Sequence, residues 1–140
     1  MDELYRYPTR PSPHSLLISG IDDSGSPEFT QRTFMIALGA DFAGPEVGTT
    51  PDTDIRGYLT NSGAQAHDYP VFGNLLLPGQ SPRTAAVTRY ENTVRPSHNG
   101  HHVTYDLPAV KHQYGCFLQN LAEGRAPVII EGTVQGGPCL

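Results

Sequence analysis

The fold is decided by residues 103–134, whose sequence is VTYDLPAVKHQYGCFLQNLAEGRAPVIIEGTV. The first five residues alternate between apolar and polar side chains, as a half-buried strand does. Residues 108–123 instead repeat apolar side chains at the period of an α-helix, about 3.6 residues. Residues 127–134 alternate again. The stretch therefore predicts one strand–helix–strand unit that forms a packed core.

The helix in this unit has a single apolar stripe. Its members fall at i, i+4, i+7, i+8 and i+11, and they are Val110, Tyr114, Phe117, Leu118 and Leu121. Pro108 suits the first helical turn, and Gly124 suits the left-handed position that follows the last turn. We expect this stripe to pack on a sheet.

Earlier in the chain, short apolar or alternating runs predict strands, and they lie at residues 16–18, 32–38, 55–60, 71–77 and 84–94. Ser26-Pro27-Glu28 is also a good helix start. For residues 32–38 we favour a strand, because Phe34 and Ile36 prefer the pleated conformation. The Asp- and Ser-rich residues 21–27 indicate a turn in which side chains bond to their own backbone.

Asn99-Gly100 is the strongest turn signal in the chain and lies between two expected strands. Residues 84–107 therefore read as an antiparallel hairpin. The fold class expected from these patterns is α+β and predominantly β: a small antiparallel, barrel-like sheet with one helix at about residues 108–123 packed on it. Residues 1–14 are expected to form an extended, proline-rich arm, and residues 15–140 a single mainly-β domain.

Composition excludes several classes of function. The formal net charge is −5 and the basic residues are scattered, so we expect no nucleic-acid partner. No apolar run is long enough to span a membrane, and residues 1–6 do not resemble a signal peptide, so no membrane partner is expected. The expected location is a virion or the cytoplasm.

The two cysteines, Cys116 and Cys139, are too few for a disulfide framework, and we expect reduced thiols. Cys116 reads as a small buried hydrophobe. Two alternatives stay open. His112 lies four residues before Cys116 on the same helical face, so the two side chains can meet, and Cys139 can bond across a subunit boundary under oxidising conditions.

Two groups of residues are candidates for holding a divalent metal. His98, His101 and His102 lie within five residues, and imidazoles bind zinc or copper. His101 and His102 point to opposite faces of a strand, which leaves His98 and His101 as the candidate ligands. Asp22 and Asp23 follow an apolar strand, as magnesium-binding carboxylates do. No other cofactor is expected, and the common motifs for nucleophilic catalysis and phosphate binding are missing from the sequence.

The sequence favours a structural or assembly protein over an enzyme. A proline-rich arm, long loops and few charges are typical of a subunit that decorates or joins a larger particle, such as a capsid decoration or cement protein of a phage virion. Its partners would be copies of itself or a larger assembly, and the expected contact residues in the arm are Tyr5, Tyr7, Pro8, Pro11 and Pro13.

Two alternatives to the assembly role remain. The first is a small metal-dependent enzyme that uses the His98/His101 turn or Asp22 and Asp23. The second is a monomeric protein-binding module whose exposed tyrosines contact one partner, because tyrosine is enriched in interface cores. The tyrosines proposed for this contact are Tyr5, Tyr7, Tyr58 and Tyr69.

Overall fold

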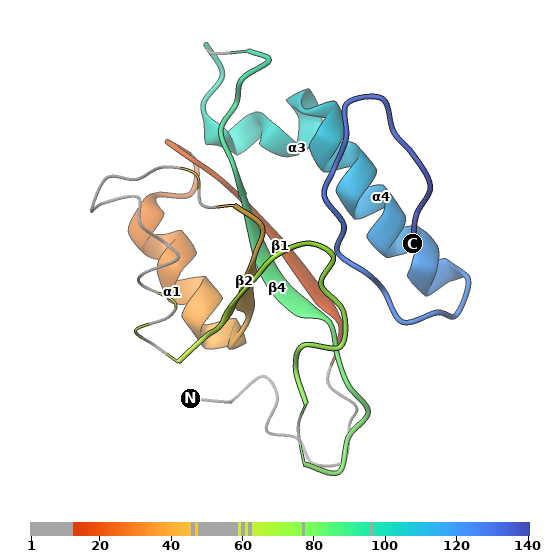
Figure 1. Ribbon diagram of the computed structural model, residues 1–140. Coiled ribbons are helices and arrows are strands. Elements are labelled where there is room, and N and C mark those ends of the chain that lie inside the picture. Colours follow the sequence, from red (N-terminus) through yellow and green to blue (C-terminus); the bar gives the residue numbers. More distant parts are fainter. Residues whose placement is uncertain are drawn as a thin grey trace.

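A parallel β-sheet with helices on both faces forms the centre of the molecule in the computed structural model (Figure 1). The structure describes residues 13–45, 47, 59, 61, 63–76, 78–95 and 97–140. Its elements in chain order are β1 (Ser15–Gly20), α1 (Glu28–Leu38), β2 (Asp41–Ala43), β3 (Ala66–His67), β4 (Ala85–Tyr90), the 3-10 helix η1 (Gly100–His102), α3 (Val103–Asp106) and α4 (Pro108–Ala122).

The four strands lie in the order β1-β4-β2-β3, and every pair is parallel. Strand β4 is central: Val87 pairs with Leu17 of β1 on one side and with Phe42 of β2 on the other. Ala85, Ala86 and Val87 are fully buried. Burial on both faces is typical of a parallel sheet, because the crossover connections place helices on both sides.

Each face of the sheet has its own apolar cluster. Helix α1 covers one face and α4 covers the other (Figure 1). On the α1 side, Met35 packs with Phe42 and Val87. On the α4 side, Phe117 packs with Ala86. Successive residues of β4 thus point to opposite clusters, as the period of a strand requires.

The prediction of an antiparallel, predominantly β fold is wrong. β4 has no hairpin partner after it, because it is already paired on both sides with parallel strands. Asn99 caps η1 instead of closing a hairpin: its Oδ1 accepts a hydrogen bond from the His101 backbone N–H at 3.0 Å. The expected strand at 103–107 is the short helix α3 followed by an extended Leu107. Alternation over five residues is too short to separate the two conformations.

The strand predicted at residues 32–38 is also wrong, because these residues belong to α1. Gln31 and Met35, one helical turn apart, form the buried face of this helix. Gly39 ends it in the left-handed conformation, with φ 61°. The burial of Met35 under the sheet outweighs the strand preference of Phe34, whose side chain is 51% exposed.

Some of the shorter predictions hold. The strand at 16–18 lies within β1, and the turn at 21–27 is confirmed, since Asp23 Oδ1 accepts hydrogen bonds from the backbone of Gly25 and Ser26 at 2.8 and 2.9 Å. In the described parts of the predicted strands 71–77 and 127–134, the structure has isolated bridges, Val71 to Ile129 and Leu75 to Arg83. The expected strand at 55–60 lies outside the described residues except for Leu59, which is buried.

The helix predicted at 108–123 is confirmed as α4, but its buried face is rotated from the expected stripe. Val110 and Phe117 are buried as predicted, whereas Leu118 and Leu121 are 57% and 41% exposed. The remaining buried positions of α4 are taken by Gln113, Cys116 and Asn120. The polar side chains among them are satisfied by hydrogen bonds to the segment that follows the helix.

The cysteines are joined rather than reduced. Cys116 of α4 and Cys139 near the end of the chain form an intramolecular disulfide with a Cα–Cα distance of 5.1 Å. The expectation of free thiols is therefore wrong, and Cys139 is not left for a bond to another subunit. Disulfides persist mainly in oxidising surroundings. In the described part of the chain, no helix has the length and apolar character needed to cross a membrane.

Candidate functional site

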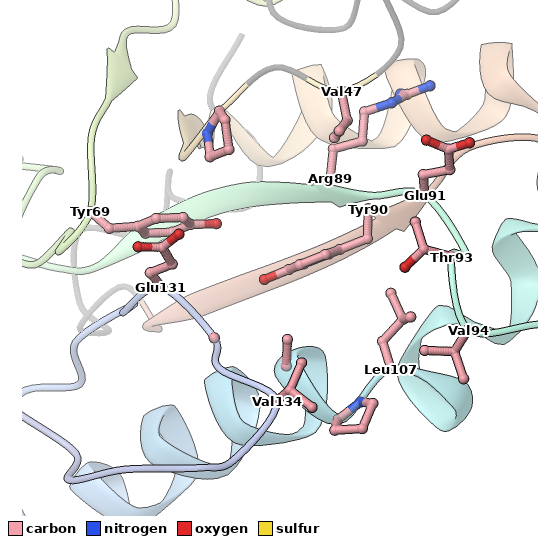
Figure 2. A pocket seen from close by; sticks show the side chains of 14 residues that line it. Val47, Tyr69, Arg89, Tyr90, Glu91, Thr93, Val94, Leu107, Glu131 and Val134 are labelled. Atoms are coloured by element: carbon pink, nitrogen blue, oxygen red, sulfur yellow. The ribbon is translucent and has the colours of Figure 1, made fainter.

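A pocket of about 290 Å³ lies outside the carboxyl ends of the parallel strands (Figure 2). Tyr90 is the last residue of β4, and Glu91 follows it. Pro45 comes two residues after β2, and Tyr69 comes two residues after β3. Parallel α/β sheets bind their ligands at this edge, where the strands end and the chain turns away. We call this hollow the carboxyl-end pocket.

The other walls of the carboxyl-end pocket come from the second half of the chain. Leu107, Pro108 and Ala109 contribute the beginning of α4, and Gly132 and Val134 contribute the segment after it. Gly132 lies so close to α4 that a Cβ there would be 1.9 Å from the Ala109 carbonyl oxygen. The two walls meet at this point only because residue 132 has no side chain.

Tyr69 of the pocket is held by a buried glutamine. Gln113 of α4 is fully buried, and its Nε2 donates hydrogen bonds to the Tyr69 hydroxyl at 3.2 Å and to the Ile130 carbonyl at 2.7 Å. Its Oε1 accepts a hydrogen bond from the Thr88 hydroxyl at 3.0 Å. On its other side Tyr69 packs on Gly44, where a Cβ would come within 2.4 Å of the ring. The position of Tyr69 is therefore fixed from two directions.

Both tyrosine hydroxyls stay protonated near neutral pH. Burial raises the pKa of Tyr69, and the charge of Glu131 adds to this. Burial also raises the pKa of Tyr90, with further contributions from Tyr69 and Glu131. A phenol with a raised pKa donates a hydrogen bond and does not act as a base. The tyrosines therefore offer hydroxyl donors and aromatic rings rather than negative charge.

The unpaired charges of the carboxyl-end pocket are negative. Glu131 lies beside the tyrosines and Glu91 lies at the opposite end (Figure 2). Among the described residues, neither carboxylate has an ion-pair partner. Arg89 is the guanidinium that lines the pocket, but both of its terminal nitrogens bond to Glu28 of α1, at 2.7 and 3.0 Å. Its charge is thereby compensated, and the field inside the pocket favours a cation.

A second, more polar hollow of about 230 Å³ adjoins the ends of β1 and β4 and shares Glu91 with the first. Here His98 Nδ1 and Asp106 Oδ2 are 2.8 Å apart, and Asn92 Nδ2 donates to the same oxygen at 2.9 Å. The hydrogen bond from Asn92, with a smaller contribution from His98, lowers the pKa of Asp106. A carboxylate at Nδ1 orients an imidazole so that its Nε2 can exchange a proton.

The residues predicted to bind a divalent metal are engaged separately. His98 bonds to Asp106, while His101 Nδ1 lies 3.0 Å from Asp23 Oδ1. Both rings contact His102, with centroid distances of 4.9 and 5.4 Å. Asp23 also completes the turn after β1, next to Asp22, which has a positive φ of 56°. Metal binding by His98 and His101 stays a prediction.

The predicted contact residues are only partly described. Tyr5, Tyr7, Pro8, Pro11 and Tyr58 lie outside the described residues, and Pro13 is exposed. Tyr69 is half-buried and lines the carboxyl-end pocket, so it is not the exposed contact residue expected from the sequence.

Sequence reasoning missed the site itself. Tyr90 and Glu91 read only as alternating strand residues, and Glu131 read as part of a strand that does not form. The signal that was available is positional: a polar residue directly after a buried parallel strand lies at the ligand-binding edge. It cannot be used until β4 is known to be parallel to its neighbours.

Comparisons of the chain with protein-family models, with curated proteins and with solved structures found no match.

Proposed function

We propose that the protein binds a small organic cation with an apolar body in the carboxyl-end pocket. The observation that carries this proposal is the pair of carboxylates, Glu91 and Glu131, which face a largely apolar pocket and have no ion-pair partner among the described residues. A ligand with one positive charge would supply a partner for one of these carboxylates and would be attracted by the other. Its apolar part would cover the hydrophobic walls.

The walls suit the apolar part of such a ligand. Leu107, Val94 and Val134 line the pocket opposite the tyrosines (Figure 2), and Val94 and Val134 are 55% and 73% exposed without a ligand. The Tyr90 ring adds an aromatic surface that attracts cations. Ligand pockets commonly measure about 300–1,000 Å³, so a pocket of about 290 Å³ favours a ligand built on one ring or one short chain.

The charge distribution argues against an anionic ligand. Arg89 is the positively charged side chain that lines the pocket, and it is already bonded to Glu28 through two nitrogens. The whole chain carries a formal net charge of −5. A carboxylate or phosphate ligand would approach Glu91 and Glu131 without a compensating cation.

The proposal is tested by calorimetric titration with three ligands that share one body and differ in charge: phenethylamine, 2-phenylethanol and 3-phenylpropanoate. We expect the amine to bind about ten-fold more tightly than the alcohol, a difference of about 1.4 kcal/mol. We expect the acid not to bind, and the preference for the amine to shrink at high salt. Equal affinity for amine and alcohol, or a preference for the acid, would contradict the proposal.

An assembly role, as a subunit that decorates or joins a larger particle, is our second proposal. It is favoured by Phe29 and Phe34 of α1, whose side chains are 72% and 51% exposed. Light scattering over a range of concentrations tests for self-association, with the Phe29→Ser variant as a comparison. A monomer at every concentration, unaffected by the substitution, would count against assembly through this helix.

A further inference from the structure

Three metal-binding side chains converge at the end of the chain, away from the carboxyl ends of the strands. His112 and Cys116 are one turn apart on α4 and share a face of the helix. The segment after α4 folds back along the helix and brings Cys139 to the same face (Figure 1). The imidazole nitrogen and the two sulfurs all lie within 4.8 Å of one another. In the described part of the chain, no other group of three or more such side chains converges in this way.

The His112 ring is held in place by the segment that follows α4. The Thr133 backbone N–H donates to Nδ1 at 3.2 Å, so Nδ1 carries no proton. Nε2 then carries the proton and donates it to the Gly137 carbonyl at 3.0 Å. A metal ion binds an imidazole through a nitrogen that carries no proton, so zinc would take the place of one of these two hydrogen bonds. Both contacts come from the segment that carries Cys139, so the ring and that cysteine are positioned together.

The donor set points to zinc. Two thiolates and one imidazole are soft and borderline ligands, and tetrahedral sites built from cysteine and histidine hold Zn²⁺. Zinc–sulfur bonds of about 2.3 Å place neighbouring ligands about 3.8 Å apart in a tetrahedron. The 4.8 Å spread therefore needs only small side-chain movements. Gln119 Oε1, which lies 3.4 Å from Cys139 Sγ, or a water molecule is available for the fourth position.

We propose that His112, Cys116 and Cys139 form a zinc site that the redox state of the disulfide controls. A dithiol reductant breaks the Cys116–Cys139 bond: the sulfurs take up two electrons and two protons, and the dithiol becomes a disulfide. Zn²⁺ then displaces the two thiol protons and binds both thiolates together with the imidazole. Oxidation of the thiolates by a disulfide reforms the bond and releases the ion. In either state the end of the chain stays attached to α4.

The test uses the full chain in its oxidised form and after reduction with a phosphine, which itself offers no thiol to the metal. Co²⁺ reports the ligands through thiolate charge-transfer bands and tetrahedral d–d bands, and competition with a chromophoric chelator gives the zinc affinity. We expect reduction to add one ion with thiolate charge-transfer bands, and the oxidised protein to show no such ion. Equal binding in the two states would overturn the proposal.

Variants identify the ligands. We expect Cys139→Ser to weaken zinc binding by the reduced protein about 100-fold or more, and His112→Gln to weaken it by about 10–100-fold. His67→Gln, which changes a histidine outside both candidate metal groups, is the matched control and should bind zinc like the wild type. Unchanged affinity in His112→Gln would overturn the proposal. If reduction alone unfolds the chain, recovery of the native circular dichroism on adding Zn²⁺ supports the site, and failure to recover contradicts it.

Discussion

Arg89 on the central strand donates hydrogen bonds to both carboxylate oxygens of Glu28 on α1, at 2.7 and 3.0 Å. The Arg89 side chain is only 1% exposed, so this pair joins β4 to the first turn of α1 with little solvent access. A negative residue also suits the first turn of a helix, where the backbone N–H groups are unpaired. The pair has two effects, because it anchors α1 and it neutralises the guanidinium beside the carboxyl-end pocket.

Removing the carboxylate of this pair should destabilise the protein. Glu28→Gln leaves the buried Arg89 charge without compensation, and we expect the free energy of unfolding to fall by about 2–4 kcal/mol. Urea denaturation measures the change. Glu123→Gln, which breaks the exposed pair with Arg125, is the matched control and should leave the unfolding midpoint unchanged. If both substitutions lowered the free energy of unfolding equally, the buried pair would contribute no more to stability than the exposed pair does.

The buried glutamine behind the tyrosines gives a second prediction. Gln113→Leu keeps a similar volume but leaves the Thr88 hydroxyl and the Ile130 carbonyl without their partner. We expect a loss of about 2–3 kcal/mol in the free energy of unfolding, because unsatisfied buried groups are costly. Gln119→Leu, at an exposed position of the same helix, is the control and should change stability little. A Gln113→Leu variant with the same free energy of unfolding as the wild type would contradict the stabilising role assigned to the hydrogen bonds of Gln113.

The orientation of α4 predicts opposite results for two adjacent apolar residues. Phe117 is 5% exposed in the cluster beneath α4, while Leu118 is 57% exposed. We expect Phe117→Ala to cost about 3–4 kcal/mol and Leu118→Ala to stay within about 0.5 kcal/mol of the wild type. Thermal or urea unfolding of the two variants provides the comparison. Similar losses at both positions would mean that α4 packs with the broader face that its sequence suggests.

The sequence predicted α4 and its ends well, because a helix of this length shows its period repeatedly and Pro108 and Gly124 mark its limits. It predicted the buried face of α4 only in part, because Val110 and Phe117 are buried while Leu118 and Leu121 are exposed. Gln113 and Asn120 look like surface residues until their hydrogen bonds to the following segment are known. A hydrophobic pattern predicts that polar side chains stay at the surface, because burying a polar group costs free energy. It does not show the hydrogen-bond partner that offsets this cost.

The sheet was predicted wrongly for a related reason. Residues 84–94 read as half of a hairpin because Asn99-Gly100 follows them, and pairing between β1 and β4, about 70 residues apart, leaves no local trace in the sequence. The short runs at 32–38 and 103–107 fit two periods equally well until tertiary packing selects one. The carboxyl-end pocket depends on this parallel arrangement, so it was beyond the reach of local patterns.

The hydrogen bond from Asn92 to Asp106 predicts a change in acid stability. Because this bond lowers the pKa of Asp106 in the folded protein, Asp106 stabilises the fold above its unfolded-state pKa. That contribution is lost as the pH falls through the lower folded-state pKa. We expect Asn92→Ala to bring the Asp106 pKa back toward its ordinary value and to move the midpoint of acid unfolding to higher pH.

Carboxyl-carbon NMR titration measures the Asp106 pKa, and circular dichroism follows the acid transition. In an Asp106→Asn background, Asn92→Ala should no longer shift the acid midpoint, which separates the electrostatic effect from a loss of packing. An unchanged Asp106 pKa in the Asn92→Ala variant would contradict the assigned cause.

Ligand binding by the carboxyl-end pocket is the central claim, and its most direct test is the affinity for phenethylamine of a variant that lacks both carboxylates. The Glu91→Gln/Glu131→Gln double variant keeps the shape of the pocket and removes its negative charge. Glu123→Gln, at an exposed position that does not line the pocket, again serves as the control. We predict that the double variant binds the amine about ten-fold more weakly than the wild type and that the control binds it equally well. Wild-type affinity in the double variant would contradict the account.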